Sequence, residues 1–437
     1  LYWAQQRPIP LTVEEEKDYQ VKGKLAIKRE SKAYLDSLDK ANNTFKAGNL
    51  LITGIDTRNR YKKEYFHYNS VLQSVLYNTV EGLAVNYGVS YSKTIDTVNN
   101  RFFAANARLR YGFSNHLLNG VAGISIPVKQ LTLSLNAGSD ITDLNSQQPE
   151  SQFLNSVYTF FYRQNYQKLY QKQFASVSLS GRIAGALQAG AYLEYANRKW
   201  LPNATDYSLF HRGDRQFTSN NPLMPAQDVP LFPDNQSLKL NLRASYDFNN
   251  RYETYPFGRR YLPSKYPTIG ITYTKGISGV LGSDVDYDHL SADISKSDID
   301  LGFYGQTSFF IGAGKFINAN KLYYPDYKHF EGNQLVIYKP TFNRFLLLDY
   351  YRFSTPDKYL EGHLEHNFSG FITNKIPFLR NLKLQELIDI NYLYTPELKN
   401  YTELGFGLQY RAVRVIYGVS YNSGSNMKNN LVIGISL

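Results

Sequence analysis

Four groups of side chains in this sequence have the types and spacings that could support chemistry. The first is His363 and His366, which enclose a glutamate in the string HLEH. Zinc peptidases hold their metal with closely placed His and carboxylate ligands. Residues three apart on a strand point to opposite faces, however. We therefore expect these histidines not to share a metal ion, and we interpret them as rim or lumen residues.

The second group is Asp284, Asp286 and Asp288, which alternate along the chain and would share one face of a strand. Calcium binds such clusters of carboxylate oxygens, so these three residues are the metal-site candidates of the sequence. We expect the row in the lumen or at an extracellular strand end. The favoured alternative is that it faces water and pairs with Lys or Arg of the lumen.

The third and fourth groups, a possible Ser-His-Asp triad and the charged residues Glu81 and Arg414, give weaker indications of a reactive site. A Ser-His-Asp hydrolase would need a recognisable serine context, and none stands out beside the seven histidines. Alternation places Glu81 and Arg414 toward the lumen, either in a charge network that braces the interior or in a selectivity filter. We therefore predict a protein that is not an enzyme and that uses no cofactor.

The elements that position these groups follow a period of two from about Leu50 to the end of the chain. In residues 238–248, for example, Leu, Ala and aromatic residues alternate with Lys, Asn, Arg, Ser and Asp. Many such segments run for about ten residues, the length of a tilted membrane-spanning strand. We predict an all-β fold, a closed antiparallel transmembrane β-barrel of about 16 strands, with a range of 14 to 18.

Composition agrees with this prediction. The chain has 38 Tyr and 26 Phe, and tyrosine suits the boundary between apolar and polar regions of a membrane. The chain has no run of about 18 apolar residues, which is the length that a membrane-spanning helix needs. The net charge of +11 is dispersed, so we predict no nucleic-acid partner. The predicted location is the outer membrane of a Gram-negative cell; a soluble all-β fold is the alternative.

Residues 1–45 differ from the barrel, which we assign to residues 46–437. Thr12 and Glu15 have the spacing of a capping box, so we expect a polar helical periplasmic lead-in. A helix is expected at a barrel mouth near residues 151–170, and long loops near residues 200–235 and 318–340. Because no signal peptide stands at Leu1, we expect the chain to be part of a longer exported precursor. The final strand ends in Leu437, where outer-membrane proteins usually have an aromatic residue.

Five strings resemble a Bacteroidota family of outer-membrane proteins of unassigned function: RPIPLTVEEE (7–16), NTVEG (78–82), PSKYPT (263–268), YKHFEGNQ (327–334) and NKIPFLR (374–380). The resemblance implies a barrel and an upstream carboxypeptidase-regulatory-like domain that precedes it in longer members. The segment 359–386 is more loosely similar to assembly barrels of the BamA and TamA type. The chain shows neither periplasmic POTRA-like repeats nor a lid-lock motif, which leaves that second similarity an architectural one.

These observations lead to one functional hypothesis and one main alternative. We expect a non-enzymatic scaffold or accessory factor in envelope protein assembly or export, with membrane lipid, lipopolysaccharide and other envelope proteins as partners. The alternative is a diffusion channel for small solutes, because the lumen face is polar. A surface hydrolase that uses His363 or His366 is a third hypothesis.

Overall fold

The protein is built mainly of β-strands. The computed structural model describes residues 11–435 except 98, 148, 211–212, 214, 249–250, 256–257, 263 and 423–424. Residues 7–10 and Leu437, which entered the predictions above, lie outside this part of the chain. The strands are β1 Ile55–Asn59, β2 Glu64–Tyr68, β3 Val75–Asn78, β4 Gly82–Asp96, β5 Arg101–Gly112, β6 Leu118–Val128, β7 Leu131–Asp143, β8 Leu169–Ala184, β9 Leu187–Trp200, β10 Asn235–Asp247, β11 Tyr252–Tyr255, β12 Gly258–Tyr261, β13 Thr268–Gly276, β14 Asp286–Asp300, β15 Gln306–Lys321, β16 Ile337–Tyr338, β17 Lys358–Asn367, β18 Gln385–Thr395, β19 Lys399–Tyr410, β20 Val413–Asn422 and β21 Ser425–Ile435.

The helices are fewer than the strands. The α-helices are α2 Val13–Glu30, α3 Lys32–Asn42, α4 Ala47–Ile52 and α5 Gln152–Tyr162. The 3-10 helices are η1 Leu72–Ser74, η2 Val280–Gly282, η3 Gly302–Tyr304, η4 Tyr324–Asp326, η5 Thr373–Lys375 and η6 Arg380–Leu382. No α-helix in the described part of the chain is both long enough and apolar enough to cross a membrane.

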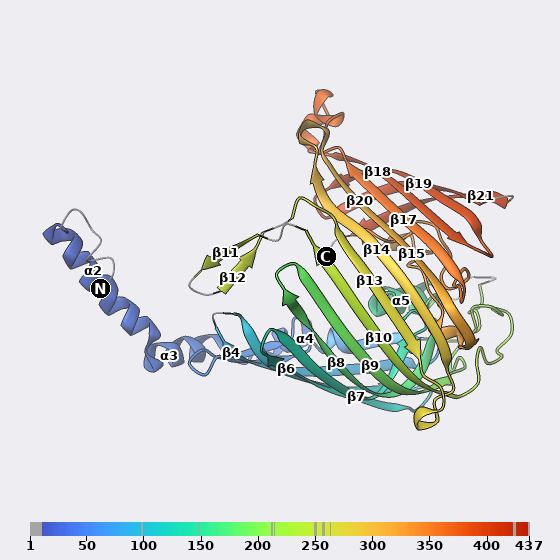
Figure 1. Ribbon diagram of the computed structural model, residues 1–437, viewed down its shortest axis with the longest axis horizontal. Helices are drawn as coiled ribbons and strands as arrows, with labels where there is room; N and C mark the ends of the chain where they lie inside the picture. The colour runs from blue at the N-terminus through green and yellow to red at the C-terminus, as the bar shows by residue number, and fades with distance from the viewer. Residues whose placement is uncertain are drawn as a thin grey trace.

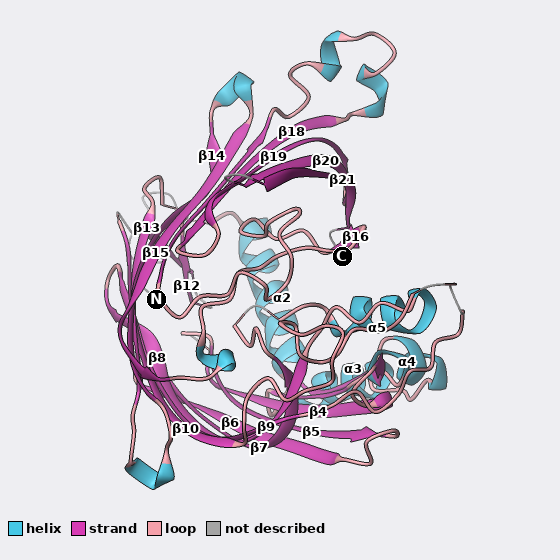
Figure 2. Ribbon diagram, turned by 90° about the vertical axis from the view of Figure 1, so that its right-hand side faces the viewer, coloured by secondary structure: helices cyan, strands magenta, loops and turns pink. Residues whose placement is uncertain are grey.

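Nineteen strands of the described residues form one large sheet. From β4 to β21 each long strand pairs antiparallel with the next long strand, while β2 and β3 pair with separate parts of β4, and β1 pairs with β2. The short hairpin β11–β12 stands outside this sheet. The sheet curves around the chain's own loops, as Figure 2 shows.

Two details of the barrel prediction need correction. The predicted range was 14 to 18 strands, whereas the sheet has 19, because β1, β2, β3 and β16 are only two to five residues long. Strands this short carry too few alternating residues to be recognised by a period of two. The predicted closure is also not seen. No backbone pairing between described residues joins β1 to β21.

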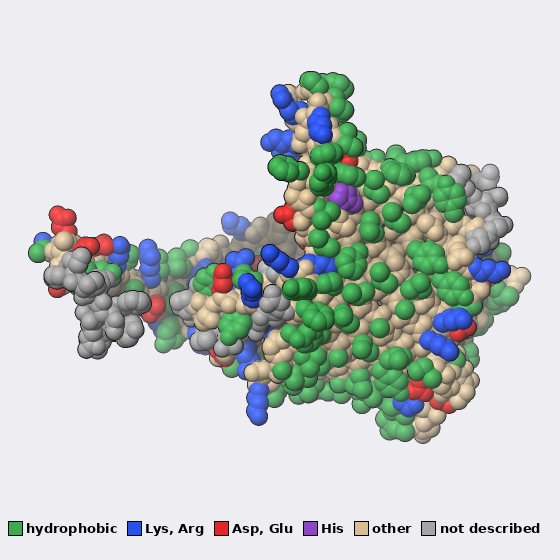
Figure 3. Space-filling view, turned by 45° about the horizontal axis from the view of Figure 1, so that its top comes forward, with side chains coloured by type: hydrophobic (Ala, Val, Ile, Leu, Met, Phe, Trp, Pro, Cys, Tyr) green, Lys and Arg blue, Asp and Glu red, His purple; other side chains and the backbone are tan. Residues whose placement is uncertain are grey.

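The two faces of the sheet have opposite polarity. In β18, Asp389 and Asn391 are buried on the concave face, while Ile390 between them is 41% exposed on the convex face. In β19, the carboxylate of Glu403 is buried inside, and Phe406 is 53% exposed outside. Figure 3 shows apolar side chains spread over the outer surface of the strands. The alternation that the sequence predicts is therefore present, with its apolar side turned outward.

A segment of the chain fills part of the space inside the sheet. Residues 322–357, between β15 and β17, are named here the plug; they contain η4 and β16. Leu335, Leu346 and Leu347 of the plug pack in one buried apolar cluster with Leu387 of β18 and Ile416 of β20. A second cluster joins further plug residues to the start of β17 and to β18 and β19. The largest apolar cores of the molecule thus lie between the plug and the concave face.

Glycines on the concave face make room for the plug. A Cβ atom at Gly405 would lie 2.6 Å from Leu346 Cδ1, and one at Gly418 would lie 3.3 Å from Leu347 Cδ1. Heavy atoms cannot approach as closely as the first distance without displacement. The small residues that alternate with apolar ones in β19 and β20 therefore allow the plug to approach the sheet backbone.

The amino-terminal helices lie beside the sheet rather than in its core. Thr12 accepts a hydrogen bond from Glu15 N while the Glu15 side chain accepts one from Thr12 N, the capping box that the spacing predicts. Helix α2 buries none of its side chains and extends away from the strands (Figure 1). The Asp39 carboxylate of α3 accepts hydrogen bonds from the Arg60 backbone and guanidinium, which ties α3 to the β1–β2 turn.

Helix α5, Gln152–Tyr162, lies in the first part of the segment 151–170, where a mouth helix was expected; the last two residues of that segment already belong to β8. Ser151 caps its first turn, and Arg163 ends it in the left-handed conformation. Tyr77 N in β3 donates to Ser156 Oγ, and the Tyr158 hydroxyl accepts from two plug amides. In the described part of residues 201–234 the chain forms no long helix or strand.

Candidate functional site

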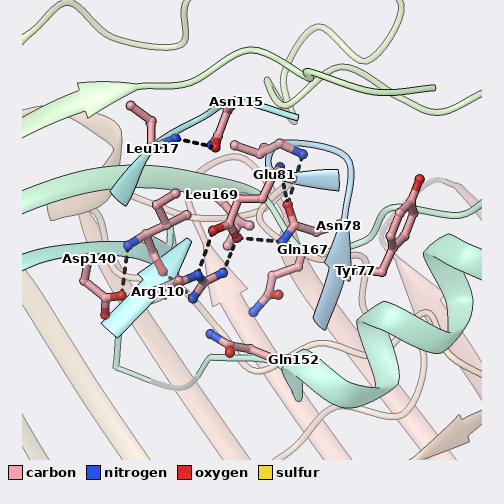
Figure 4. Close-up of polar contacts among 12 residues, drawn as sticks. Tyr77, Asn78, Glu81, Arg110, Asn115, Leu117, Asp140, Gln152, Gln167 and Leu169 are labelled. Carbon is pink, nitrogen blue, oxygen red and sulfur yellow. Dashed lines mark hydrogen bonds and ion pairs between the residues drawn. The ribbon is translucent and has the colours of Figure 1, made fainter. Parts of the chain in front are cut away.

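The concave face carries buried ion pairs that hold its loops in place, and the first of them lies at the start of β4. The guanidinium of Arg110 in β5 donates from Nε to Glu81 Oε1 at 2.7 Å and pairs from Nη2 with Glu81 Oε2. Both residues are at most 2% exposed. Figure 4 shows Asn78 beside them, where its Oδ1 accepts from the backbone of Val80 and Glu81.

This arrangement explains the NTVEG string. Asn78 closes the tight turn between β3 and β4, and its Nδ2 donates to Glu81 Oε2. Arg110 Nη1 also reaches the carbonyl of Ile141 in β7, so three strands meet at one charge pair. Both carboxylate oxygens of Glu81 are bound by Asn78 and Arg110. The pair therefore holds the strands together, as expected for a charge network that braces the interior.

A second buried pair connects the sheet to the plug. Arg198 of β9 binds both carboxylate oxygens of Asp326 in η4, at 2.6 and 2.9 Å. Asn235 Oδ1 accepts from Arg198 Nε. Arg198 is 3% exposed and the Asp326 side chain is fully buried. A bidentate guanidinium–carboxylate pair fixes orientation as well as distance, so this contact positions the amino-terminal end of the plug.

A polar chain across β17, β18 and β19 holds the rest of the plug. Lys328 of the plug pairs with Glu361, which contacts His363; His363 Nδ1 lies 2.8 Å from Asn391 Oδ1, and Asn391 Nδ2 donates to Glu403. All four strand residues are at most 3% exposed. The Glu403 carboxylate also accepts hydrogen bonds from two successive plug amides. Charged groups thus serve as fixed acceptors for the backbone of the plug.

A third site binds the plug to the loop that carries α5. Arg344 of the plug pairs with Glu150 at 2.7 Å and with Glu331 at 2.6 Å, and the Tyr350 hydroxyl donates to Glu150. Arg344 is 6% exposed. Burial lowers the pKa of Arg344 less than the two carboxylates raise it, so the guanidinium stays charged. The plug is therefore fixed on several sides by buried charge pairs.

A polar cavity remains beside the plug, with a volume of about 660 Å³. Its wall includes Lys172 and Glu194, paired at 2.8 Å, and Arg243 and Asp293, paired at 3.1 Å. Charges that face this cavity are therefore largely neutralised by neighbours on the adjacent strands.

The sequence candidates fall into separate places. His363 is buried on the concave face, whereas His366 lies on the other face with Nδ1 beside Thr307 Oγ1, so the two do not converge. Arg414 points inward and pairs with Glu365 at 2.7 Å. Among the described residues, no cluster of three or more His, Cys, Asp or Glu is arranged to hold a metal ion.

The aspartate row lies at the start of β14, at the strand end. Asp286 and Asp288 point to the convex side, opposite to buried Tyr287. Asp288 accepts from the Lys275 ammonium, and Asp284 from the Lys321 ammonium. Asp286 accepts from two asparagine side chains. Each carboxylate is thus bound by protein groups: Asp284 and Asp288 by lysines and Asp286 by asparagines, none of them the lumen Lys or Arg of the favoured alternative.

Sequence reasoning missed the residues that bind the plug. Arg198 and Asp326 are 128 residues apart in the chain, and no local pattern links them. Glu403 offered a signal, because it is a carboxylate on the lumen side of a strand with apolar residues on the other side. The run FLLL at 345–348 was a further signal that the segment is buried.

Comparison with known proteins gives a family but no function. A model described as "Family of unknown function (DUF5686) C-terminal domain" matches residues 48–408. No curated protein matches the sequence. The organism group and the upstream regulatory-like domain implied by the resemblance stay predictions.

Several solved structures are similar to this chain. BamA from Haemophilus ducreyi lacking POTRA domains 1–3 is 12% identical, with 85% of this chain and 70% of that one covered and a TM-score of 0.45. CdiB from Acinetobacter baumannii is 13% identical, with coverages of 82% and 57% and a TM-score of 0.37. A mutant porin of Rh. blastica is 10% identical, with coverages of 85% and 96% and a TM-score of 0.33.

Proposed function

Because this chain belongs to the family of unknown function described as the DUF5686 C-terminal domain, we propose a role from its own structure: an outer-membrane β-barrel that acts as a non-enzymatic scaffold or accessory factor in envelope protein assembly or export. Membrane lipid, lipopolysaccharide and other envelope proteins are its proposed partners. The observation that carries this proposal is a lumen occupied by the protein's own plug, which buried ion pairs fix in place.

The membrane location rests on the inverted polarity of the sheet. Leu135, Ile271, Leu364, Ile390 and Phe406 on different strands are each at least 38% exposed, although large apolar side chains usually avoid water. The opposite face buries charged residues. Hydrocarbon around the strands and polar groups inside are the arrangement of a membrane barrel.

A membrane environment also favours closing of the sheet into a barrel. An unpaired strand edge in hydrocarbon leaves N–H and C=O groups without partners, at a cost of several kcal/mol per group. We therefore expect the edges of β1 and β21 to be satisfied in the membrane, which would complete the barrel. In the structure, β16 of the plug already pairs with Ile433 and Gly434 of β21.

The scaffold role is supported by the filled interior, which leaves the outer surfaces of the protein available for partners. A plug held by Arg198, Glu403 and the Glu150–Arg344 pair blocks a wide aqueous path, and the charged groups of these pairs are engaged in holding it. Function is then carried by outer surfaces. Helix α2 exposes Val21 and Leu25, one turn apart on the same side, at 64% and 42%, and these two apolar side chains are suited to contact with a protein partner.

The test is affinity purification of the tagged protein from gently solubilised envelopes, followed by mass spectrometry. We expect a reproducible set of envelope assembly or export proteins. The double variant Val21→Glu, Leu25→Glu should lose part of this set, while the control Lys24→Glu on the same helix should keep it. Recovery of the barrel alone, from mild detergent and after cross-linking, would refute the scaffold role.

The diffusion channel is the second candidate, and the polar cavity of about 660 Å³ favours it. Planar-bilayer recording separates the two. With the plug seated, we expect no conductance above background. The variant Gly405→Leu should unseat the plug and open a conducting path, whereas Gly362→Leu, whose nearest neighbour to an added Cβ is 3.9 Å away, should not. Steady conductance by the unmodified protein would favour the channel.

A further inference from the structure

A second cavity lies at the mouth of the sheet, outside the ion-pair network described above. Its volume is about 520 Å³, within the range of small-molecule sites. The carboxyl-terminal end of α5, the segment before β8, part of the loop 201–234 and the plug all contribute to its wall. Its lining includes four cationic side chains, Arg163, Lys168, Arg215 and Arg352, against one carboxylate, Asp349.

Lys168 is the central residue of this cavity. It is 5% exposed, and its ammonium donates to Thr218 Oγ1 at 2.7 Å. Within the described part of the chain, no carboxylate oxygen lies within 4.0 Å of it. The charge of Asp228 raises the pKa of Lys168, but the Asp228 carboxylate already accepts from Ser219 Oγ. A buried ammonium without an anion is costly.

The surrounding groups show why the ammonium lacks charge compensation. The Thr218 hydroxyl donates to Asn165 Oδ1 and so offers Lys168 only a neutral oxygen. Burial lowers the pKa of Lys168 to about 7, and Asp228 raises it by less. An anion that entered the cavity would restore the charged form. The position of Lys168 is thus that of a cation with room for an external partner.

Three guanidinium groups at the rim add to this preference for anions. Arg163 donates to the hydroxyl of Ser208, and Arg215 to the carbonyl of Tyr162, both of which are neutral acceptors. Arg352 lies 3.6 Å from Asp349 and is 67% exposed, a weak surface pair. Guanidinium groups in this state can still bind the oxygens of a phosphate in a bidentate manner.

The rest of the lining suits a hydroxylated ligand. Gln164, Gln216 and Gln334 also line the cavity, and a glutamine amide both donates to and accepts from hydroxyl groups. The Gln334 amide already contacts Asp349 and Tyr350 N, so Gln164 and Gln216 are the two that a ligand could engage first. A cavity of about 520 Å³ has room for a phosphate group together with a sugar ring. We propose that this cavity binds a phosphorylated saccharide, with its phosphate against Lys168 and the rim arginines and its hydroxyl groups against the glutamines.

Two sources can supply this chemistry, a soluble sugar phosphate or the headgroup of a phosphorylated glycolipid. The first experiment is titration calorimetry of the purified full chain in a neutral detergent, with glucose 1-phosphate as the probe and glucose as the comparison. We expect glucose 1-phosphate to bind and glucose to bind at least tenfold more weakly. The same affinity for both probes, or no binding of either probe together with no lipid in the second experiment, would overturn the proposal.

Variants connect binding to the named residues. Lys168→Met should weaken binding of glucose 1-phosphate at least tenfold, while Lys199→Met, which removes an exposed lysine of β9, should leave it unchanged. Arg163→Gln changes a rim residue and should weaken binding about threefold or more, which keeps the test valid if Lys168→Met fails to fold. Unchanged affinity in both cavity variants would refute the site.

Native mass spectrometry of the protein extracted from membranes distinguishes the two sources. A retained phosphorylated glycolipid that is lost from Lys168→Met identifies a lipid headgroup, and binding of the free sugar phosphate without retained lipid identifies a soluble ligand. This site can fail while the scaffold proposal stands, because copurification of envelope proteins does not depend on Lys168.

Discussion

The substitution Glu403→Gln tests most directly how the plug is held. The Glu403 carboxylate is fully buried and accepts four hydrogen bonds: at Oε2 from Leu346 N and Asn391 Nδ2, and at Oε1 from Leu347 N and the Tyr401 hydroxyl. In glutamine, one of these oxygens becomes an amide nitrogen that faces donors. The substitution is nearly isosteric, so its effect reports on hydrogen bonding rather than on packing.

The size of the effect can be worked out from this geometry. The less costly orientation turns the new amide toward Leu347 N and Tyr401, because the hydroxyl can rotate to accept. One plug N–H then stays unsatisfied and the remaining bonds lose their charge. A buried unsatisfied donor costs about 1–3 kcal/mol and charge assistance adds about 1 kcal/mol. We expect plug docking to weaken by about 2–4 kcal/mol, or about 30- to 700-fold in the opening equilibrium.

The chain contains no cysteine, so a single introduced thiol reports on the plug alone. Ser354→Cys places it at a buried plug position that is 8% exposed. Maleimide labelling in detergent should accelerate by the same factor when Glu403→Gln is added. The control Glu397→Gln makes the same chemical change at an exposed residue of the β18–β19 turn and should not accelerate labelling. Equal labelling rates in the two variants would refute the reasoning.

Three further predictions follow from the structure. Ile390→Lys on the convex face should destabilise the folded protein by about 2–4 kcal/mol in lipid bilayers, measured by urea unfolding, because the ammonium would lie in hydrocarbon; a cost near zero would refute the membrane assignment. Arg198→Met should cost about 3–5 kcal/mol because it leaves Asp326 buried and unpaired, and adding Asp326→Leu should recover most of that loss in the same assay. Burial lowers the folded-state pKa of Lys168 to about 7, with Asp228 opposing the shift more weakly, so the unfolded state binds one more proton between about pH 7 and pH 10. The unmodified protein should therefore gain stability relative to Lys168→Met as pH rises through this window, and a difference in melting temperature that is flat with pH would contradict the burial of this ammonium.

Most of the β architecture could be predicted because every strand repeats the same rule. In β10, Leu242 and Tyr246 lie exposed outside while Lys239 and Arg243 face ion-pair partners inside, as the alternation predicts. The period of two depends only on local geometry. For long strands, the sequence alone therefore predicts which residues point outward and which point inward.

The interior could not be predicted in the same way. The plug is held by pairs such as Arg198 with Asp326, whose members are far apart in the chain and carry no periodic signal. Its apolar residues, among them Phe345 and Leu348, lie in a segment whose aromatic and charged composition suggested a loop. The cavity around Lys168 depends on four separate segments, and only the folded chain brings them together.

The pairing of β16 with β21 has a consequence for the order of folding. Ile337 and Ile433 are about 96 residues apart in the chain, and five long strands, β17 to β21, have to be laid down before these two residues can meet. Such a non-local contact forms late, because the entropy of closing a long loop opposes it until the intervening strands are ordered. Seating of the plug against the last strand would then mark completion of the sheet, and a chain stalled before β21 would expose the apolar residues of the plug to proteases.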